Sequence, residues 1–198
     1  MSDTDMPRLL EPGKRDGRDP NALSFREARP ASICEVASWP DRLEAVANEL
    51  SKSCGVNLPK GPGGFTAGGG KRLCWLAFGR FLVISEDATT TAALKERIST
   101  DDGSVVDLGH ARYGVRIEGE KAAAVLNKAV AIDLDIAAFP AGALAQAPIH
   151  HIPVLIMRLD DARFDVFAPS SLAQAFVDWL EDAAQEFGYH IGAPGGLS

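Results

Sequence analysis

Apolar residues recur along this chain at two spacings, and the change from one spacing to the other marks the expected elements. Between residues 43 and 54 they fall at helical intervals and form one face of an amphipathic helix. Residues 73–76 and 80–84 are short apolar runs separated by a turn, which predicts a β-hairpin. The second half repeats this succession, with a hairpin expected over residues 152–167 and an amphipathic helix after Pro169.

These patterns predict the element order β-α-β-β-α-β in the first half and the same order again through the last helix. That order is the split βαβ, or ferredoxin-like, arrangement. The predicted fold is therefore α+β, with two consecutive split βαβ units and helices on one side of each sheet. The strands are expected at residues 32–36, 73–76, 80–84, 104–108, 113–117, 152–159 and 163–167, and the helices at residues 38–55, 89–98, 120–129 and 170–188.

The first helix has start and stop signals. Ser38 is followed by Pro40 and, three positions after the serine, by Asp41, which predicts a capping box. Gly55 can supply the left-handed residue that ends the helix. The glycine-rich residues 60–71 that follow are expected to form a loop.

The two halves resemble each other in amino-acid sequence as well as in the order of their predicted elements. For example, Arg80-Phe81-Leu82-Val83 parallels Arg163-Phe164-Asp165-Val166. We expect one domain over residues 31–190, built from pseudo-repeat subdomains 31–108 and 109–190.

The two ends of the chain show no periodicity. Residues 1–30 are rich in Pro, Asp, Arg and Gly and are expected to form a disordered or extended arm. Residues 191–198 are expected to be a frayed tail.

Composition narrows the possible partners. The chain of 198 residues has a net charge of −7 and no basic stripe, so nucleic acid and anionic membranes are not expected partners. It has no apolar run of 18 residues and no cationic, apolar leader at its start, which favours a cytoplasmic protein.

No motif for catalysis or cofactor binding stands out. The glycines of residues 60–71 fit neither a Walker nor a dinucleotide pattern, and a strand follows them rather than a helix. The four histidines, His110, His150, His151 and His190, lack the spacing of a zinc site. Of these, only His110 could serve as a loop base, and no nucleophile motif accompanies it.

The other reactive residue types favour structural roles. The cysteines, Cys34, Cys54 and Cys74, lie among apolar neighbours and are expected to be core residues. Asp101-Asp102 and Asp160-Asp161 fall in predicted turns, and Asp133 and Asp135 suggest a solvated strand edge. We therefore predict no catalytic, cofactor-binding or metal-binding residue on this chain.

Many segments together resemble a known family. The second half resembles the gamma subunit of heterotetrameric sarcosine oxidase at Val106–Arg112, Val115–Gly119, Ala124–Lys128, Asp133-Leu134, Phe139–Gly142, Ala145-Gln146, Phe164–Phe167, Ser170-Ser171, Trp179-Leu180 and Ala184–Gly188. In the first half, Trp75–Val83 looks like that family's W-L-G-P-[DE]-x-W-L segment, although Ala77-Phe78-Gly79 departs from its usual turn.

The resemblance implies a fold similar to the folate-binding region of the glycine-cleavage T-protein. It also implies a non-catalytic subunit of an enzyme that oxidatively demethylates sarcosine to glycine. FAD, FMN, NAD, tetrahydrofolate and zinc are then expected on the alpha, beta and delta partner subunits, and this chain is expected to pack mainly against alpha. Trp39, Trp75, Trp179 and Phe139 are candidate contact residues, with Trp179 favoured as core.

Three alternatives stay open from sequence. The chain could be the equivalent subunit of a related N-methyl amino acid dehydrogenase, because the substrate site lies elsewhere in such complexes. It could be a stand-alone folate-binding or one-carbon transfer protein, which the kinship of fold suggests. It could also be a hydrolase that uses His110 with a nearby aspartate.

Overall fold

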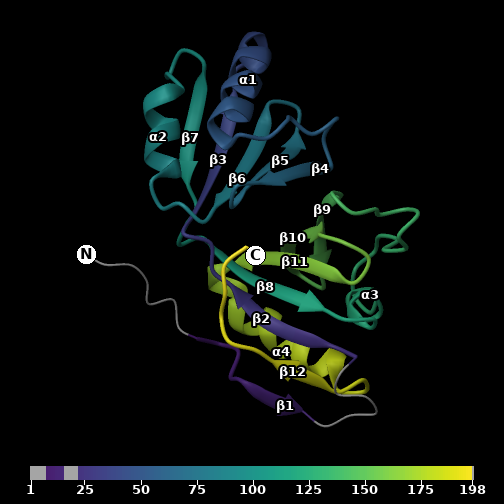
Figure 1. The fold of residues 1–198 in the computed structure, drawn as a ribbon. Coiled ribbons are helices and arrows are strands. Elements are labelled where there is room, and N and C mark those ends of the chain that lie inside the picture. Colours follow the sequence, from purple (N-terminus) through teal and green to yellow (C-terminus); the bar gives the residue numbers. More distant parts are fainter. Residues whose placement is uncertain (1–7, 16–21, 198) are drawn as a thin grey trace.

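The computed structural model describes residues 8–15 and 22–197, whose strands form two sheets (Figure 1). The first sheet and its helices comprise β3 (Ser32–Ser38), α1 (Leu43–Cys54), β4 (Gly64–Gly68), β5 (Lys71–Ala77), β6 (Arg80–Ser85), α2 (Thr90–Arg97) and β7 (Gly103–Asp107). The second comprises β1 (Gly13–Arg15), β2 (Ser24–Ala28), β8 (Arg112–Glu118), α3 (Ala122–Leu126), β9 (Leu144–Ile149), β10 (Ile152–Arg158), β11 (Arg163–Pro169), α4 (Ala173–Ala184) and β12 (Tyr189–Ile191).

The strand orders confirm the predicted fold class. The five-stranded sheet runs β7-β3-β6-β5, the antiparallel order of a ferredoxin-like unit, with β4 added at the edge. The seven-stranded sheet runs β1-β12-β2-β8-β11-β10-β9. It follows the same plan, except that β2 is inserted between the first and last strands of the unit, parallel to β12. The expected loop over residues 60–71 was wrong in part, because β4 lies within it.

The structure corrects the expected arm of residues 1–30. Within it, β2 is paired on both sides, and Phe25 is buried in the core of the second unit. The strand was missed because Arg26 and Glu27 give it a polar character, and because its pairing partners lie about 90 and 165 residues further along the chain. The parts of this prediction that concern residues 1–7 and 16–21 lie outside the described residues.

The expected frayed tail was also wrong where the structure describes it. Gly195 forms a bridge with Ala28, and Leu197 is buried between the sheets. The segment after β12 therefore runs back across the molecule to the junction of the two units (Figure 1). Ser198 lies outside the described residues.

The first helix begins differently from the prediction and ends as predicted. Ser38 is the last residue of β3, and a short 3-10 turn, Pro40–Arg42, leads into α1 with no side-chain cap. The capping box does not form, because Ser38 is held in β3 by its pairing with Gly103 and its N–H donates to the carbonyl of Gly79. Gly55 ends the helix in the left-handed region with a φ of 67°, and its N–H donates to the carbonyl of Ser51.

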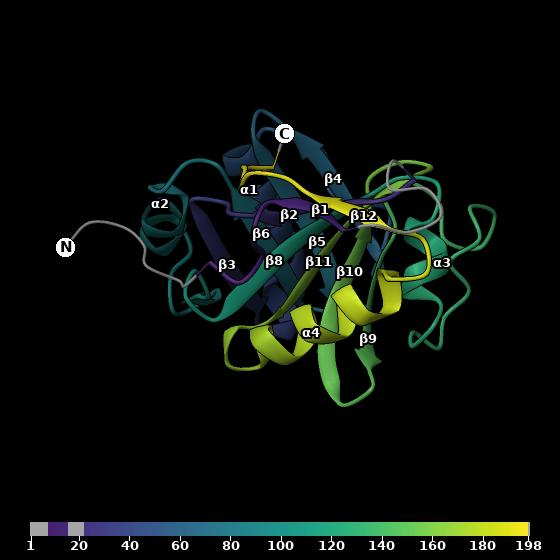
Figure 2. The ribbon, with the colours of Figure 1, turned by 90° about the horizontal axis from the view of Figure 1, so that it is seen from below.

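The helices cover only the outer faces, and the two inner faces pack against each other (Figures 1 and 2). The apolar face of each sheet that the helices leave free is therefore buried for the most part between the sheets. This inter-sheet layer consists of Ile33, Cys74, Leu82, Ile84, Leu144, Leu155, Met157, Phe167 and Leu197.

The edge strands β4 and β9 also join the sheets. The N–H of Leu144 donates to the carbonyl of Gly63, and the N–H of Phe65 donates to that of Gly142, each over 2.8 Å. The two sheets are therefore linked through the backbone at this edge as well as through side chains.

The four candidate aromatic residues fall into different environments. Trp179 packs against the core of the second unit as predicted, and Phe139 is buried in the same core. Trp75 is partly buried against Phe81, whereas Trp39 is 47% exposed. Of these four, Trp39 is the one exposed enough to contact a partner.

Candidate functional site

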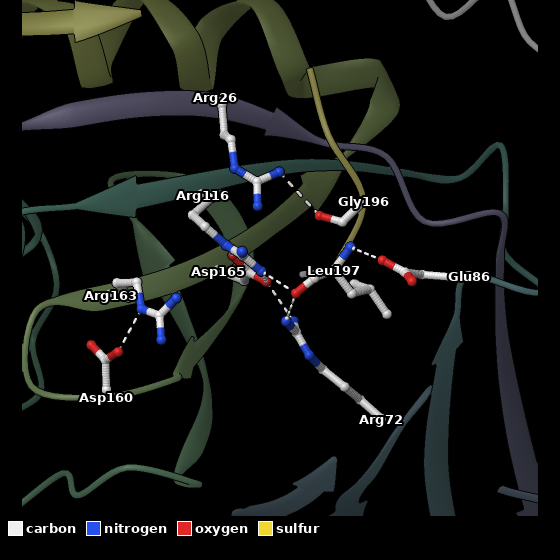
Figure 3. Close-up of polar contacts among 9 residues, drawn as sticks. All are labelled: Arg26, Arg72, Glu86, Arg116, Asp160, Arg163, Asp165, Gly196 and Leu197. Atoms are coloured by element: carbon white, nitrogen blue, oxygen red, sulfur yellow. Dashed lines mark hydrogen bonds and ion pairs between the residues drawn. The ribbon is translucent and has the colours of Figure 1, made fainter. Parts of the chain in front are cut away.

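The densest polar cluster of the described residues lies between the two sheets and is centred on the buried Asp165 of β11 (Figure 3). Arg116 lies opposite Asp165 on the neighbouring strand β8. Its Nε donates to Oδ1 over 2.7 Å, and its Nη2 donates to Oδ2 over 3.0 Å. Arg72 of β5, in the other sheet, donates to Oδ2 of the same carboxylate. One carboxylate therefore binds two guanidinium groups that belong to different sheets.

The chain's carboxyl-terminal segment completes this cluster. The carbonyl of Leu197 accepts hydrogen bonds from Arg72 Nη2 over 2.8 Å and from Arg116 Nη2 over 2.7 Å. The N–H of Leu197 donates to the Glu86 carboxylate over 2.7 Å, and Arg26 donates to the carbonyl of Gly196 over 3.0 Å. The segment thus contacts both sheets through its backbone (Figure 3).

The electrostatics keep these groups charged. Burial would lower the pKa of the Arg116 guanidinium, but its hydrogen bonds and ion pair with Asp165 raise that pKa above its ordinary value. The pKa of Arg26 is lowered, first by burial and then by the nearby charge of Arg116. Asp165 accepts hydrogen bonds on both oxygens, two from Arg116 and one from Arg72. Such a cluster fixes geometry and offers no free acid or base.

A second buried carboxylate, Glu27 of β2, is saturated in the same way. It accepts hydrogen bonds from the N–H groups of Leu9 and Leu10, from the Tyr113 hydroxyl and from Arg29. Burial alone would raise the pKa of Glu27, but these four donors lower it overall. Glu27 therefore anchors residues 8–10 to the second unit.

His110 lies at the rim of a cleft of about 170 Å³ between the two units. The connections from β2 to β3 and from β7 to β8 line this cleft, which contains Asp107 as well. Asp107 Oδ1 accepts the N–H of Gly109, and the carbonyl of His110 accepts the Ser170 hydroxyl. The structure thus brings His110 and an aspartate into one cleft. The cysteines, which would be the strongest nucleophiles, do not line it.

The remaining predicted residues lie apart from one another. His150 and His151 form the turn between β9 and β10 rather than lying on a strand, and His190 is exposed on β12. Asp133 and Asp135 are in a loop, not at a strand edge, and each accepts the backbone N–H two residues further on. In the part of the chain that the structure describes, no three His, Cys, Asp or Glu residues gather as a metal site would require.

All three cysteines are buried and free, which confirms that they are core residues. Burial raises the pKa of Cys54 to about 11 and that of Cys74 to about 12. Their thiols therefore stay protonated and unreactive at neutral pH.

The Asp165 cluster was not predicted from the sequence. In β11, Phe164 and Val166 point to the helix side, so the alternation places Asp165 on the opposite face. In a single sheet that face would be exposed to water, where a polar residue is ordinary and does not indicate a buried cluster. Charged residues at inward positions of three separate strands become informative only when a second sheet is known to cover them.

Comparison with known proteins decides the family. No family model matches the chain. The sarcosine oxidase gamma subunit of Corynebacterium sp. (strain P-1) is 31% identical over 141 residues, which cover 70% of this chain and 69% of that protein. This chain belongs to the sarcosine oxidase gamma subunit family. The gamma subunit of Arthrobacter sp. is 28% identical over 173 residues, covering 86% of this chain and 84% of that protein.

Solved structures agree with this membership of the gamma subunit family. A chain of the heterotetrameric sarcosine oxidase from Corynebacterium sp. U-96 superposes with a TM-score of 0.77 at 26% identity, over 86% of this chain and 88% of that one. The glycine cleavage aminomethyltransferase T from Bartonella henselae superposes with a TM-score of 0.64 at 18% identity, over 89% of this chain and 48% of that one. The second likeness shows a shared fold and confirms the fold kinship that the resemblance implied.

Proposed function

We propose that this chain is the gamma subunit of a heterotetrameric sarcosine oxidase and that its role is structural. The observation that carries the proposal is the match over most of both chains to a member of such a complex, at 26% identity and a TM-score of 0.77. The identity of 31% to a named gamma subunit supports it from sequence alone.

The charges of the described residues also support a structural role. Asp165 and Glu27 are the buried carboxylates, and each is saturated by donors from separate segments of the chain. General acid or base catalysis needs a group that is free to exchange a proton with a substrate. These two carboxylates instead hold strands and both ends of the described chain in place.

We place the chemistry on the partner subunits of a cytoplasmic complex. There, sarcosine would be oxidatively demethylated to glycine, with FAD, FMN, NAD, tetrahydrofolate and zinc bound to the alpha, beta and delta subunits. The helices of the described residues, at most 12 residues long in α1 and α4, are too short and too polar to cross a membrane.

Co-expression with the alpha, beta and delta subunits of a heterotetrameric sarcosine oxidase tests the proposal. We expect size-exclusion chromatography to recover this chain in one complex with them, and the complex to oxidise sarcosine. The matched control omits only this chain and should yield less assembled complex. Recovery of this chain only as a free species, or sarcosine oxidation by this chain alone, would contradict the proposal.

Two further assays separate the alternatives. Oxidation of N-methylglutamate or dimethylglycine in place of sarcosine would assign the complex to a related dehydrogenase. Titration of the isolated chain with tetrahydrofolate tests the one-carbon alternative, for which saturable binding with a Kd of about 1 μM would correspond to about −8 kcal/mol. We expect no saturation, since the likeness to aminomethyltransferase T concerns the fold only.

A further inference from the structure

One end of the inter-sheet layer is not covered by the five-stranded sheet. The hairpin of β9 and β10 carries Pro148 and Pro153 directly opposite each other, and both are exposed. Pro153 shares its face of the strand with Leu155, which belongs to the inter-sheet layer. The same apolar face of the hairpin is therefore buried away from the turn and exposed to solvent near the turn. The turn between β9 and β10 lies at the bottom of the molecule in Figure 2.

This uncovered face forms the floor of a groove of about 560 Å³. Its walls come from the connection between β7 and β8, through Leu108 and Ala111, and from Pro169 at the end of β11. We call it the Arg112 groove, after the first residue of β8, which is one of its lining residues. An exposed apolar surface with a polar rim is typical of a protein interaction site.

Arg112 is half-buried and also lines the cleft that holds His110, so this one residue borders both the groove and the cleft. Among the described residues, no ion pair or hydrogen bond engages the Arg112 guanidinium. Thr91, which also lines the cleft, is buried, and its hydroxyl faces the Cys34 thiol, a weak acceptor. A half-buried arginine whose guanidinium has no partner favours an incoming anionic acceptor.

The other charged groups of the cleft do not supply that anion. Glu27 is already bound by Arg29 and Tyr113, and Asp107 uses one oxygen to accept the N–H of Gly109. His110 at the rim adds a further donor. An approaching carboxylate would therefore meet Arg112 and His110, and the opposing charges of the cleft are Asp107 and the already paired Glu27.

We infer that the Arg112 groove receives a segment of a partner subunit in which apolar side chains flank one aspartate or glutamate, whose carboxylate pairs with Arg112. This inference rests on the proposed function, since it takes the partner from the oxidase complex. The groove is open along its length, whereas sites for small molecules enclose most of the ligand. Pro148 and Pro153 present a rigid surface that lacks backbone donors, which suits apolar contacts.

Charge and shape are tested separately in the assembled complex. Arg112→Glu should weaken the apparent affinity for the tagged partner subunits by at least about tenfold, because it places like charges together, and Arg112→Gln should weaken it less. Pro153→Asp should also weaken it, because it puts a charge on the apolar floor. Lys60→Glu and Pro62→Asp are matched controls at exposed positions that do not line the groove. The thermal midpoint of each isolated variant reports whether it is folded.

A photo-reactive residue at the exposed Ala111 identifies the occupant without disturbing Arg112. We expect a cross-linked peptide from a partner subunit that contains an acidic residue among apolar ones. A cross-link to residues 1–21 of this chain, or saturation of the groove by free acetate or glycine with no effect on assembly, would overturn the inference.

The two proposals can fail independently. If the unmodified chain does not assemble with the alpha, beta and delta subunits, the proposed function fails. If it assembles, and Arg112→Glu and Pro153→Asp assemble with the same affinity as their controls, only the inference about the groove is lost.

Discussion

Arg72 of the five-stranded sheet donates a hydrogen bond to Asp165 of the seven-stranded sheet, and both residues are buried. Since Arg116 binds the same carboxylate from the adjacent strand, Asp165 sets the position of Arg72 relative to the second unit. Apolar contacts in the inter-sheet layer are non-directional, so this ion pair supplies a specific alignment that they lack.

Asp165→Asn should destabilise the protein by about 3–5 kcal/mol, because it leaves Arg72 and Arg116 as buried charges without a counter-ion. Urea denaturation followed by far-UV circular dichroism measures the free energy of unfolding. Asp160→Asn is the matched control, since its ion pair with Arg163 is exposed and should be worth less than about 1 kcal/mol. Equal effects of the two substitutions would contradict the role given to Asp165.

Deletion of residues 196–198 should destabilise the junction more than Leu197→Ala does. The substitution removes an apolar side chain and keeps the carbonyl that Arg72 and Arg116 bind, whereas the deletion removes both. Hydrogen exchange should show faster exchange in β5 and β8 of the truncated chain than in those strands of the substituted one. Similar exchange in the two variants would show that the carbonyl contributes little.

Stability should depend on pH through Glu27, whose pKa in the folded protein is lowered from 4.5. Because the pKa of Glu27 is lower in the folded protein than in the unfolded chain, its stabilising effect is fully present at pH values above the pKa of the unfolded chain. The effect is lost as the pH falls through the pKa of the folded protein. Unfolding free energies measured from pH 7 down to pH 3 should therefore fall less steeply for Glu27→Gln than for the unmodified chain. Parallel curves would be inconsistent with this linkage. Tyr113→Phe removes one of the four donors and should give an intermediate curve.

Gly119→Ala should cost more than about 2 kcal/mol. Gly119 has a φ of 123°, and a Cβ atom there would come within 2.1 Å of the Ala22 carbonyl oxygen. Gly61→Ala is the control, because the position has no positive φ and no atom within 4 Å, so stability should stay the same or rise by about 0.5 kcal/mol. Thermal unfolding of the two variants makes the comparison, and a tolerated Gly119→Ala would show that the backbone at Ala22 can move.

The three cysteines should not react with a thiol reagent in the native protein. Cys54 and Cys74 are buried with pKa values of about 11 and 12, and Cys34 is fully buried with a raised pKa. A colorimetric thiol assay should therefore detect all three only after denaturation. A thiol that reacts rapidly under native conditions would indicate local opening of the first unit.

The sequence by itself determined the helices, the hairpin strands of the two units and their order. The spacing of apolar residues in α1, in the hairpin of β5 and β6, and in α4 was sufficient, because each of these elements buries one face against neighbours close in the chain. Gly55 marked the end of its helix for the same local reason. The family resemblance over the second half followed from residues that are contiguous in sequence.

Only the tertiary structure decided how the two units face each other and where the ends of the chain lie. β2 pairs with β8 and β12, and Leu197 reaches Arg72 and Arg116, through contacts between residues far apart in the sequence. Alternation along a strand shows that Asp165 and Arg116 share a face, but it does not show whether water or a second sheet covers that face. The buried cluster and the Arg112 groove both depend on that covering, which arises from packing and not from any local pattern.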